Sequence, residues 1–412
     1  MTSIYKPLGD LVQLVDERNK DLTVKRNLGL SISKEFIPTV GNTVGTNMAN
    51  YKVVKRNQFA CSLMQVRRDK KMPVALLRQF DQVIISPAYP VFKVIDEEVL
   101  LPEYLMMWFS REEFDRHACF LAVGGVRGSL EWDDFMEMEL PVPSIEKQRA
   151  IVKEYQTVTD RIKLNEQLNQ KLEETAQAIY RHWFVDFEFP NEDGLPYKSS
   201  GGDMIYNEEL EKELPERWSV NSFTEVVELK GGGTPRTTEP NYWKGEIPFF
   251  TPKDVDVSYY SVVTEKNITQ SGLESCSSKL YPRNTVFVTA RGTVGAVSLA
   301  GEQMAMNQSC YAVLGDERIG AFYIHQLTIE TIKSLKKEAV GAVFKALVTK
   351  DFNGKMVLNP PRSISKMYNA KILPIYELLW NNSKQRDALK RLSDIVLQRL
   401  SKVESHEAEQ VS

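Results

Sequence analysis

The sequence predicts an α+β fold in which two similar mixed domains are separated by two long antiparallel helices that form a coiled coil. The first observation is an ungapped internal repeat, which brings Ala122 onto Ala339 and Pro143 onto Pro360, 217 positions later. A period of this length predicts two domain-sized copies and excludes a solenoid of short repeats. The second observation is that a long stretch of helical periodicity follows each copy. The third is a length of 412 residues, which is enough for several domains, each with its own core.

The first mixed domain is expected at residues 1–143. Within it, short apolar runs predict strands at Gln82–Ser86 and Val91–Ile95, and a helix is expected from Leu101 to His117. The repeat begins near the end of this domain. Its remaining members are Val123, Gly124, Val126, Leu130, Asp134 and Phe135, which recur as Val340, Gly341, Val343, Leu347, Asp351 and Phe352.

A long helix is expected at 144–186, because no proline or glycine follows Pro143 and the apolar residues recur in steps of three and four. A second helix is expected at 362–405, where the same offset reproduces the heptad pattern, although Pro374 should kink it or delay its regular start. The predicted seam of the helix pair consists of Ile151, Tyr155, Val158, Ile162, Asn165, Leu172 and Ile179 on the first helix and Tyr368, Ile372, Leu379, Asn382, Leu389, Val396 and Leu400 on the second.

Asn165 is a polar residue at an apolar seam position, and the repeat maps it onto Asn382. A polar residue at such a position costs stability but fixes the register of a coiled coil. We therefore expect the two asparagines to lie close together where the helices cross. The alternative is that both face solvent.

A linker is expected at 187–217, where six prolines and glycines and an acidic run indicate loops with one short helical turn. The second mixed domain follows at 218–361, and a tail at 406–412 ends the chain. Leu8–Leu14 parallels Phe223–Leu229, and the strand Val83–Ser86 parallels Val286–Thr289, each with the loop that follows it. The residues between these segments do not match, so the two domains share a scaffold and carry different inserts.

Residue patterns for catalysis are absent from the sequence. Gly231–Pro235 lacks the lysine of a phosphate-binding loop, and no nucleophile elbow or zinc-protease motif occurs. The four cysteines and four histidines are scattered, so we expect no metal site and no cofactor. No apolar run is long enough for a membrane helix and no signal pattern opens the chain, which predicts a cytoplasmic protein.

The charge is unevenly distributed along the chain, although the net charge is only −3. Twelve basic residues and three acidic ones lie between Lys20 and Arg78, and acids predominate from Asp81 to Glu146. One interpretation is an electrostatic footprint for phosphates. The other is a solvated face whose charges are balanced in space.

Several loops have residues suited to DNA. Three consecutive glycines at Gly231–Gly233 allow close backbone approach, and arginine forks onto phosphates or guanine edges. The alternative for this loop is that Tyr242 and Trp243 pack in a core and the glycines only turn the chain. The candidate DNA-binding residues are Arg67, Arg68, Lys70, Lys71, Tyr89, Gly232, Gly233, Thr234, Arg236, Lys253 and Arg291.

Taken together, these motifs resemble the DNA-specificity subunit of type I restriction-modification systems. The resemblance covers nearly the whole chain and rests on the segments Gly231–Trp243, Gly245–Asp254, Ala290–Gly295, Ser86–Tyr89, Ile145–Ile151 and His182–Phe187. It implies two target-recognition domains, each followed by a conserved spacer helix, with the paired helices setting the distance between two half-sites of double-stranded DNA. It also implies two methyltransferase (modification) subunits as partners, and motor-nuclease (restriction) subunits where the host supplies them. Catalysis and its cofactors would belong to those partners. One departure is Ile364–Met367, which replaces the Ile145–Gln148 motif at the start of the second helix.

Three hypotheses follow for the function. The first is a non-catalytic DNA reader that holds methyltransferase subunits on an asymmetric bipartite site, because unlike inserts predict unlike half-sites. The second is an enzyme with its own DNA methyltransferase or nuclease site. The third is a coiled-coil interaction scaffold that does not bind DNA.

Overall fold

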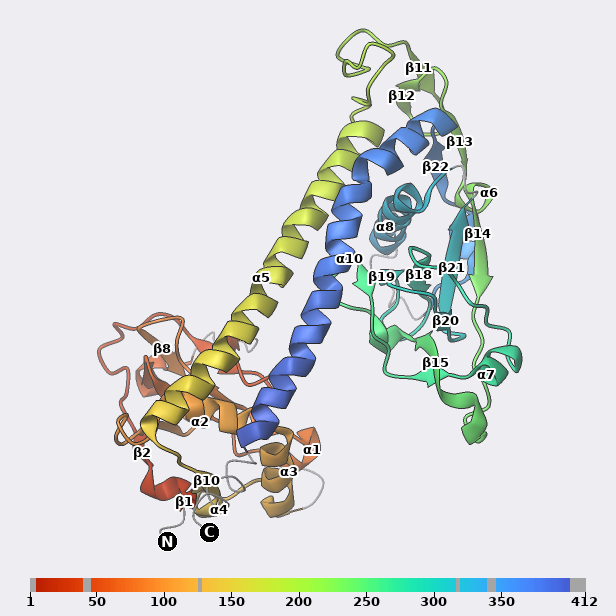
Figure 1. Cartoon of the computed structure of the whole chain (residues 1–412). Coiled ribbons are helices and arrows are strands. Elements are labelled where there is room, and N and C mark those ends of the chain that lie inside the picture. The colour runs from red at the N-terminus through yellow and green to blue at the C-terminus, as the bar shows by residue number, and fades with distance from the viewer. Residues whose placement is uncertain (1–4, 40–45, 125–127, 316–318, 339–345, 401–412) are drawn as a thin grey trace. The chain divides into compact units, whose positions relative to one another are not determined.

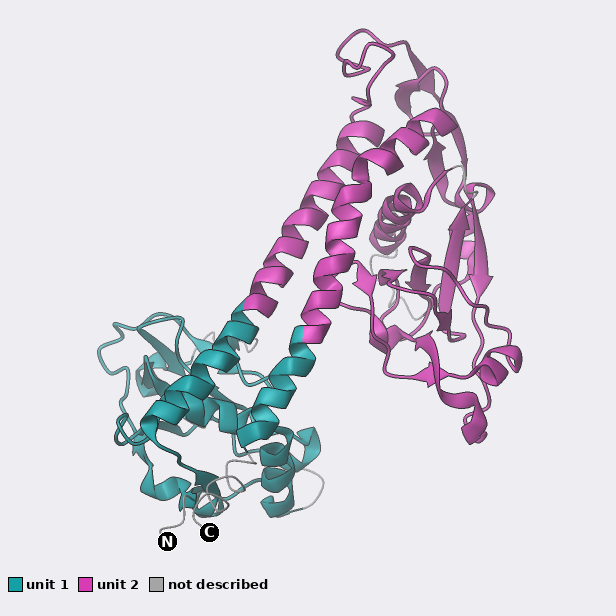
Figure 2. Ribbon diagram, viewed as in Figure 1, with its two compact units in different colours: residues 1–160, 389–412 teal, residues 161–388 magenta. Residues whose placement is uncertain are grey.

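The computed structural model describes residues 5–39, 46–124, 128–315, 319–338 and 346–400. The chain divides into two compact units, one of residues 1–160 with 389–412 and one of residues 161–388 (Figure 2). Each unit contains strands and helices, as the predicted α+β class requires. Five members of the repeat lie outside the described residues, as does the tail at 406–412; these members are Val126, Ala339, Val340, Gly341 and Val343.

Unit 1 is built around an antiparallel four-stranded sheet in the order β2-β9-β6-β7. Its strands are β2 (Val12–Val15), β9 (Val91–Val94), β6 (Gln58–Cys61) and β7 (Val74–Leu76). Three two-stranded sheets accompany it, formed by β1 (Tyr5–Pro7) with β10 (Glu139–Pro141), β3 (Leu28–Leu30) with β4 (Phe36–Pro38), and β5 (Lys52–Lys55) with β8 (Gln82–Ile85). The short helices are η1 (Leu8–Asp10), η2 (Met48–Asn50), α1 (Val66–Asp69) and α4 (Trp132–Glu137).

The single helix expected from Leu101 to His117 is wrong, because the structure has two helices there. α2 (Pro102–Phe109) ends where the Ser110 hydroxyl donates to the carbonyl of Met106 at 2.8 Å, and α3 (Glu112–Leu121) follows an extended residue. The break lets the rings of Phe109 and Phe114 meet in the core at 5.1 Å. In one continuous helix, residues five apart point to different faces.

Unit 2 has a five-stranded sheet in the order β14-β21-β18-β19-β16 and a three-stranded sheet in the order β17-β15-β20. The first comprises β14 (Val227–Gly231), β21 (Cys310–Gly315), β18 (Val286–Thr289), β19 (Val297–Ala300) and β16 (Tyr260–Ser261); the second comprises β17 (Asn267–Ile268), β15 (Trp243–Phe250) and β20 (Ala305–Met306). β13 (Ser219–Ser222) pairs with β22 (Met356–Asn359). The helices are α6 (Phe223–Val226), η3 (Pro240–Tyr242), η4 (Pro252–Asp254), α7 (Gln270–Glu274), α8 (Ala321–Glu338) and α9 (Thr349–Asn353). α8 packs against the five-stranded sheet (Figure 1).

The linker differs from the prediction, because it contains a β-hairpin where one helical turn was expected. β11 (Met204–Asn207) pairs antiparallel with β12 (Lys212–Pro215). Three aromatic rings stack beside the hairpin, with 4.6 Å between the centroids of Phe189 and Tyr197 and 5.3 Å between those of Phe189 and Trp218. The prolines, glycines and acidic run had indicated loops with one short helical turn, but charged side chains also suit the exposed turn of a hairpin.

The internal repeat corresponds to successive elements in the two units. α4, β10 and the first long helix begin at Trp132, Glu139 and Ile145; α9, β22 and the second long helix begin at Thr349, Met356 and Arg362, each 217 positions later. The sheets also share the strand order β2-β9-β6-β7 and β14-β21-β18-β19. This order shows that the parallel between Val83–Ser86 and Val286–Thr289 is wrong. β8 pairs with β5 outside the main sheet, and β6 is the strand that occupies the place of β18.

The predicted antiparallel helix pair is confirmed as α5 (Ile145–Phe184) and α10 (Arg362–Arg399). Within unit 2, the contacts of α5 move toward the start of α10 as α5 proceeds: Asn165 bonds Gln385, Asn169 bonds Asn382, and the rings of Trp183 and Tyr368 lie 5.7 Å apart. Within unit 1, Glu154 pairs with Arg399 at 3.3 Å. All the predicted seam residues are buried or half-buried.

Pro374 does not delay the start of α10, which begins at Arg362. Proline inside a helix removes one backbone hydrogen bond and clashes with the preceding turn, which bends the helix. Figure 1 shows α10 bending in its N-terminal part.

Asn165 is fully buried, but its partner differs from the expected one. Its Nδ2 donates to Oε1 of Gln385 at 2.9 Å, whereas Asn382 donates to Oδ1 of Asn169 at 3.0 Å. Asn169 also donates to the hydroxyl of Ser383 at 3.3 Å. The polar residues therefore form two neighbouring hydrogen-bonded groups between the helices, without a hydrogen bond from Asn165 to Asn382.

Candidate nucleic-acid interface

Two loops of unit 2 that carry candidate residues converge on the turn Asn307–Ser309, between β20 and β21. Gly233 donates its backbone N–H to the carbonyl of Met306 at 3.2 Å, immediately before this turn. The backbone N–H groups of Ala290 and Arg291 both donate to the carbonyl of Ser309, at 2.7 and 3.3 Å. No sequence pattern marked this turn as functional, although its three polar residues directly precede a strand.

The glycine loop after β14 is shaped by close packing. A Cβ on Gly232 would overlap the backbone of Asn307, and a Cβ on Gly233 would lie 2.7 Å from the backbone N of Ser277. The indole N–H of Trp243 donates to the carbonyl of Arg236 at 3.1 Å and so fixes the end of the loop. Glycine is thus required at both positions because a side chain would overlap neighbouring parts of the protein. The side chains of Thr234 and Arg236, by contrast, are exposed.

The loop after β18 and the η4 turn are neighbours. A Cβ on Gly292 would lie 3.4 Å from Cβ of Pro252, at the start of the turn that exposes Lys253. Gly292 adopts φ +78°, a left-handed conformation that glycine permits without strain. The exposed side chains of Arg236, Lys253 and Arg291 therefore belong to loops in one continuous network.

A buried ion pair ties this part of unit 2 to the helix pair. The Arg386 side chain on α10 is only 1% exposed and bonds to Asp256, two residues after η4, and to Asp387 at 3.1 Å. Burial, the largest single influence, lowers the pKa of Arg386, but the charges and hydrogen bonds of Asp256 and Asp387 together outweigh burial and raise it. On α5, Glu173 Oε1 accepts from the Ser258 hydroxyl and the Tyr259 backbone N–H, both at 2.9 Å. Burial raises the pKa of Glu173.

The basic cluster of unit 1 lies in the loop between β6 and β7, on and beside α1. Arg67, Arg68, Lys70 and Lys71 are exposed, and Arg68 pairs with Asp69 at 2.7 Å. Leu130 donates its N–H to the carbonyl of Leu63 at 2.9 Å, and its repeat mate Leu347 donates to that of Ala290, also at 2.9 Å. The basic cluster and the Arg291 loop therefore occupy equivalent places in the two units.

This equivalence corrects the predicted match of Ser86–Phe92 with the loop after β18. In the sheet registers, Ala60 faces Val91 and Thr289 faces Cys310. The segment before β9, which contains half-buried Tyr89, corresponds instead to the Asn307–Ser309 turn before β21. Strand order is not visible in local sequence, and for that reason the two similar apolar runs were matched wrongly.

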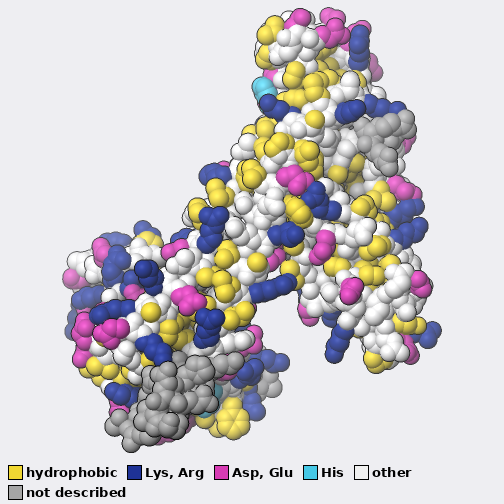
Figure 3. Space-filling view, viewed as in Figure 1, with side chains coloured by type: hydrophobic (Ala, Val, Ile, Leu, Met, Phe, Trp, Pro, Cys, Tyr) yellow, Lys and Arg dark blue, Asp and Glu magenta, His cyan; other side chains and the backbone are white. Residues whose placement is uncertain are grey.

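Much of the basic block between Lys20 and Arg78 is neutralised by acidic neighbours. The side chain of Lys34 is only 8% exposed and pairs with Asp115 at 2.7 Å, and burial lowers the pKa of Lys34. Arg56 pairs with Asp81 at 2.9 Å, and Lys55 with Glu17 at 2.7 Å. On the face shown in Figure 3, lysine and arginine side chains are interspersed with acidic ones. Nearby acidic side chains thus neutralise part of the basic segment from Lys20 to Arg78, whereas the basic residues from Arg67 to Lys71 remain exposed.

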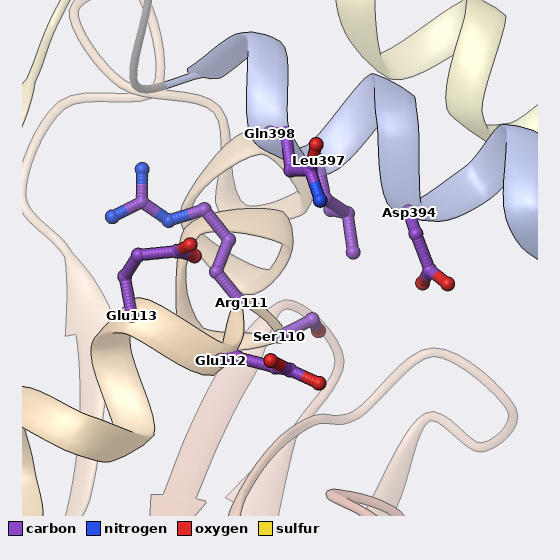
Figure 4. A pocket seen from close by; sticks show the side chains of 7 residues that line it. All are labelled: Ser110, Arg111, Glu112, Glu113, Asp394, Leu397 and Gln398. Atoms are coloured by element: carbon purple, nitrogen blue, oxygen red, sulfur yellow. The ribbon is translucent and has the colours of Figure 1, made fainter. Parts of the chain in front are cut away.

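The described residues of unit 2 surround a hollow of about 630 Å³ whose lining includes Phe189, Tyr197 and Trp218. A cavity of about 120 Å³ in unit 1 lies where the α2–α3 break meets the end of α10 (Figure 4). In that view the side chains of Arg111 and Glu113 lie side by side, and burial lowers the pKa of Arg111. Across the described ranges, no group of three or more His, Cys, Asp or Glu side chains is placed to hold a metal ion. Within the same ranges, no helix is both long and apolar enough to cross a membrane.

Comparison with known proteins places these features in one family. The family model described as the type I restriction modification DNA specificity domain matches residues 6–174 and again residues 215–389. The chain is 24% identical over 313 residues to the MjaIX specificity subunit of Methanocaldococcus jannaschii, covering 74% of this chain and 70% of that protein. It is 22% identical over 400 residues to the HindI specificity subunit of Haemophilus influenzae, covering 85% and 86%.

A solved structure shares the fold. The S subunit of a type I restriction-modification system from M. genitalium superposes with a TM-score of 0.55 at 14% identity, covering 96% of this chain and 95% of that one. At this level of identity, the likeness establishes the fold alone.

Proposed function

Because the chain belongs to the type I restriction-modification DNA specificity family, we propose that each of its two mixed domains reads one half of a bipartite DNA site. Family membership makes the chain a non-catalytic DNA specificity subunit. The observation that supports the proposal is the network of loops around Asn307–Ser309, which carries exposed arginine, lysine and amide side chains. Phosphate contacts from the cations would supply affinity and register, and contacts to base edges would supply specificity.

The two halves of the site should differ in sequence. The equivalent loops of the two units carry unlike residues: Arg67 to Lys71 in one, and Arg291 to Gly295 in the other. The turns that precede β9 and β21 also differ, with Tyr89 in the first and Gln308 in the second. Unlike side chains at equivalent places read unlike bases, so the target should be asymmetric.

We propose that the helix pair fixes the unread gap between the half-sites. α5 has 40 residues, which corresponds to a rod of about 60 Å at 1.5 Å per residue. Inserting one heptad into each helix preserves the seam and lengthens the rods by about 10 Å, or about three base pairs at 3.4 Å each. Sequencing of methylated bases should then show a longer gap between unchanged half-sites. An unchanged gap would rule out the ruler function.

The helices are also the proposed docking surface for two methyltransferase subunits and, where present, for motor-nuclease subunits. Several large apolar side chains on them are exposed, including Leu168 at 43%, Leu378 at 52% and Ile395 at 48%. Where such side chains adjoin one another on a helix surface, they would favour contact with another protein. A cytoplasmic location, as expected from the sequence, fits such an assembly.

One set of measurements separates this function from the alternatives. The purified chain together with its methyltransferase partner should methylate DNA, and the chain alone should not label DNA from S-adenosylmethionine. Labelling by the isolated chain would favour the enzyme hypothesis. Binding of DNA should weaken steeply as salt rises, because phosphate contacts release counterions. Absence of any DNA binding by the assembled complex would favour the scaffold.

A further inference from the structure

The exposed residue at the centre of the loop network is Gln308, which was not among the candidate residues of the sequence and for which no base has yet been named. We propose that Gln308 reads an adenine in the half-site bound by the second domain. The inference rests on the proposed function and adds to it a residue and a base.

The turn that carries Gln308 is held rigidly on both sides. Asn307 donates its N–H to the carbonyl of Phe250 at 3.0 Å, and its side-chain oxygen accepts the N–H of Ser309 at 3.0 Å. Cys310 then donates to the carbonyl of Asn307 at 3.2 Å, which closes the turn. A base-reading side chain needs this kind of support, because a loose residue loses entropy on binding and discriminates poorly.

The carboxamide of Gln308 is oriented by one neighbour. The Thr234 hydroxyl, on the glycine loop, donates to Oε1 of Gln308. A carbonyl oxygen has two lone pairs, so Oε1 keeps one for a ligand. Nε2 has no hydrogen-bond partner among the residues that the structure describes. On the major-groove edge of adenine, Oε1 can accept from N6–H while Nε2 donates to N7.

The surroundings favour a nucleic acid over other ligands. Exposed Arg236 and Arg291 lie on the two loops that pack against the turn, and Arg291 donates its N–H to Ser309. Cations on both sides of an amide would hold a DNA backbone while the amide reaches the base edge. The turn also has a counterpart in unit 1. Ala290 donates to Ser309 at 2.7 Å as Cys61 donates to Pro90 at 3.1 Å, so Gln308 stands where Tyr89 stands.

The test uses the chain with its methyltransferase partner subunits. Methylated-base sequencing first gives the target, and binding is then measured on duplexes in which each base pair of both half-sites is replaced in turn. Gln308→Ala should reduce discrimination by about 10-fold, within a range of about 5- to 150-fold, at one adenine of one half-site. Gln308→Glu should favour cytosine at that position, because a carboxylate accepts from the cytosine amino group. Thr234→Val, which frees the carboxamide, should weaken the same preference.

The matched control is Gln303→Ala. Gln303 is also exposed but lies on the turn after β19, at the other end of that strand from the Arg291 loop, and its removal should leave every base preference unchanged. The role of Gln308 would be overturned, and the proposed function kept, if the wild type discriminates bases in both half-sites and Gln308→Ala has the same base preferences. A uniform loss of binding to all duplexes would also overturn it, since that is the result of a lost backbone contact. Absence of discrimination by the wild type would instead refute the proposed function.

Discussion

Replacing Arg386 by methionine should destabilise the second unit substantially, because the change leaves two carboxylates without their shared cation. The Arg386 side chain is 1% exposed, and those of Asp256 and Asp387 are 19% and 16% exposed. At the 3.1 Å that separates Arg386 from Asp387, the gross attraction is about 5 kcal/mol for an effective dielectric constant of about 20. Desolvation of the three charges offsets much of that attraction.

The expected net cost of Arg386→Met is about 3 kcal/mol. Breaking a buried ion pair costs about 3–5 kcal/mol, and partial exposure of both carboxylates favours the lower end of that range. For a unit of this size, the loss corresponds to a fall in Tm of about 6–12 °C. The control is Lys333→Met on α8, whose ion pair with Glu330 is exposed and should contribute at most about 1 kcal/mol.

Urea unfolding of Arg386→Met, Asp256→Asn and the double variant gives a double-mutant cycle. The cycle should show a coupling energy of at least about 1 kcal/mol, since the two side chains are in direct contact. The reasoning would be refuted if the two single variants lose equal, additive amounts of unfolding free energy. It would also be refuted if Arg386→Met loses no more than Lys333→Met.

Three further changes have distinct outcomes. Burial lowers the pKa of His325 to about 3, so below about pH 6.5 the unfolded chain takes up a proton that the folded chain does not. The free energy of unfolding should therefore fall by about 1.4 kcal/mol per pH unit as the pH drops. Unfolding measured from pH 7 to 5 should show a smaller pH dependence in His325→Phe than in the wild type. Gly232→Ala should cost about 1–3 kcal/mol by overlap with the Asn307 turn and disturb DNA reading, whereas Gly231→Ala, with open space around it, should cost little; equal Tm values for the two would contradict this. Asn165→Leu should raise Tm, because Oδ1 of Asn165 is buried and has no hydrogen-bond partner among the residues that the structure describes; a lower Tm would show that these polar contacts are stabilising.

The features that the sequence predicted correctly are those set by periodicity and repetition. The heptad pattern after Pro143 and its copy after Pro360 predicted both long helices, and in the structure the repeat offset relates α9 and β22 to α4 and β10. Periodicity is a local property of the chain, and an amphipathic helix of 40 residues shows it many times.

The features that the sequence missed depend on partners far away in the chain. Nothing local distinguishes β8 from β6 as the counterpart of β18, because sheet order is decided by which strands pair. The Asn307–Ser309 turn was not predicted for the same reason, because its place at the centre of the loops depends on contacts with the distant segments at Gly233 and Arg291. The role of the glycines was likewise left open until the atoms packed against them were known.

The matched bonds from Leu130 to Leu63 and from Leu347 to Ala290 are made by main-chain atoms alone. A hydrogen bond between main-chain atoms does not depend on which side chains the loop carries. Substitutions in either loop can therefore accumulate, or a foreign loop can be grafted there, while the point of attachment stays intact. Under the proposed function, a new DNA target would require changes in these loops alone, with the scaffold beneath them unchanged.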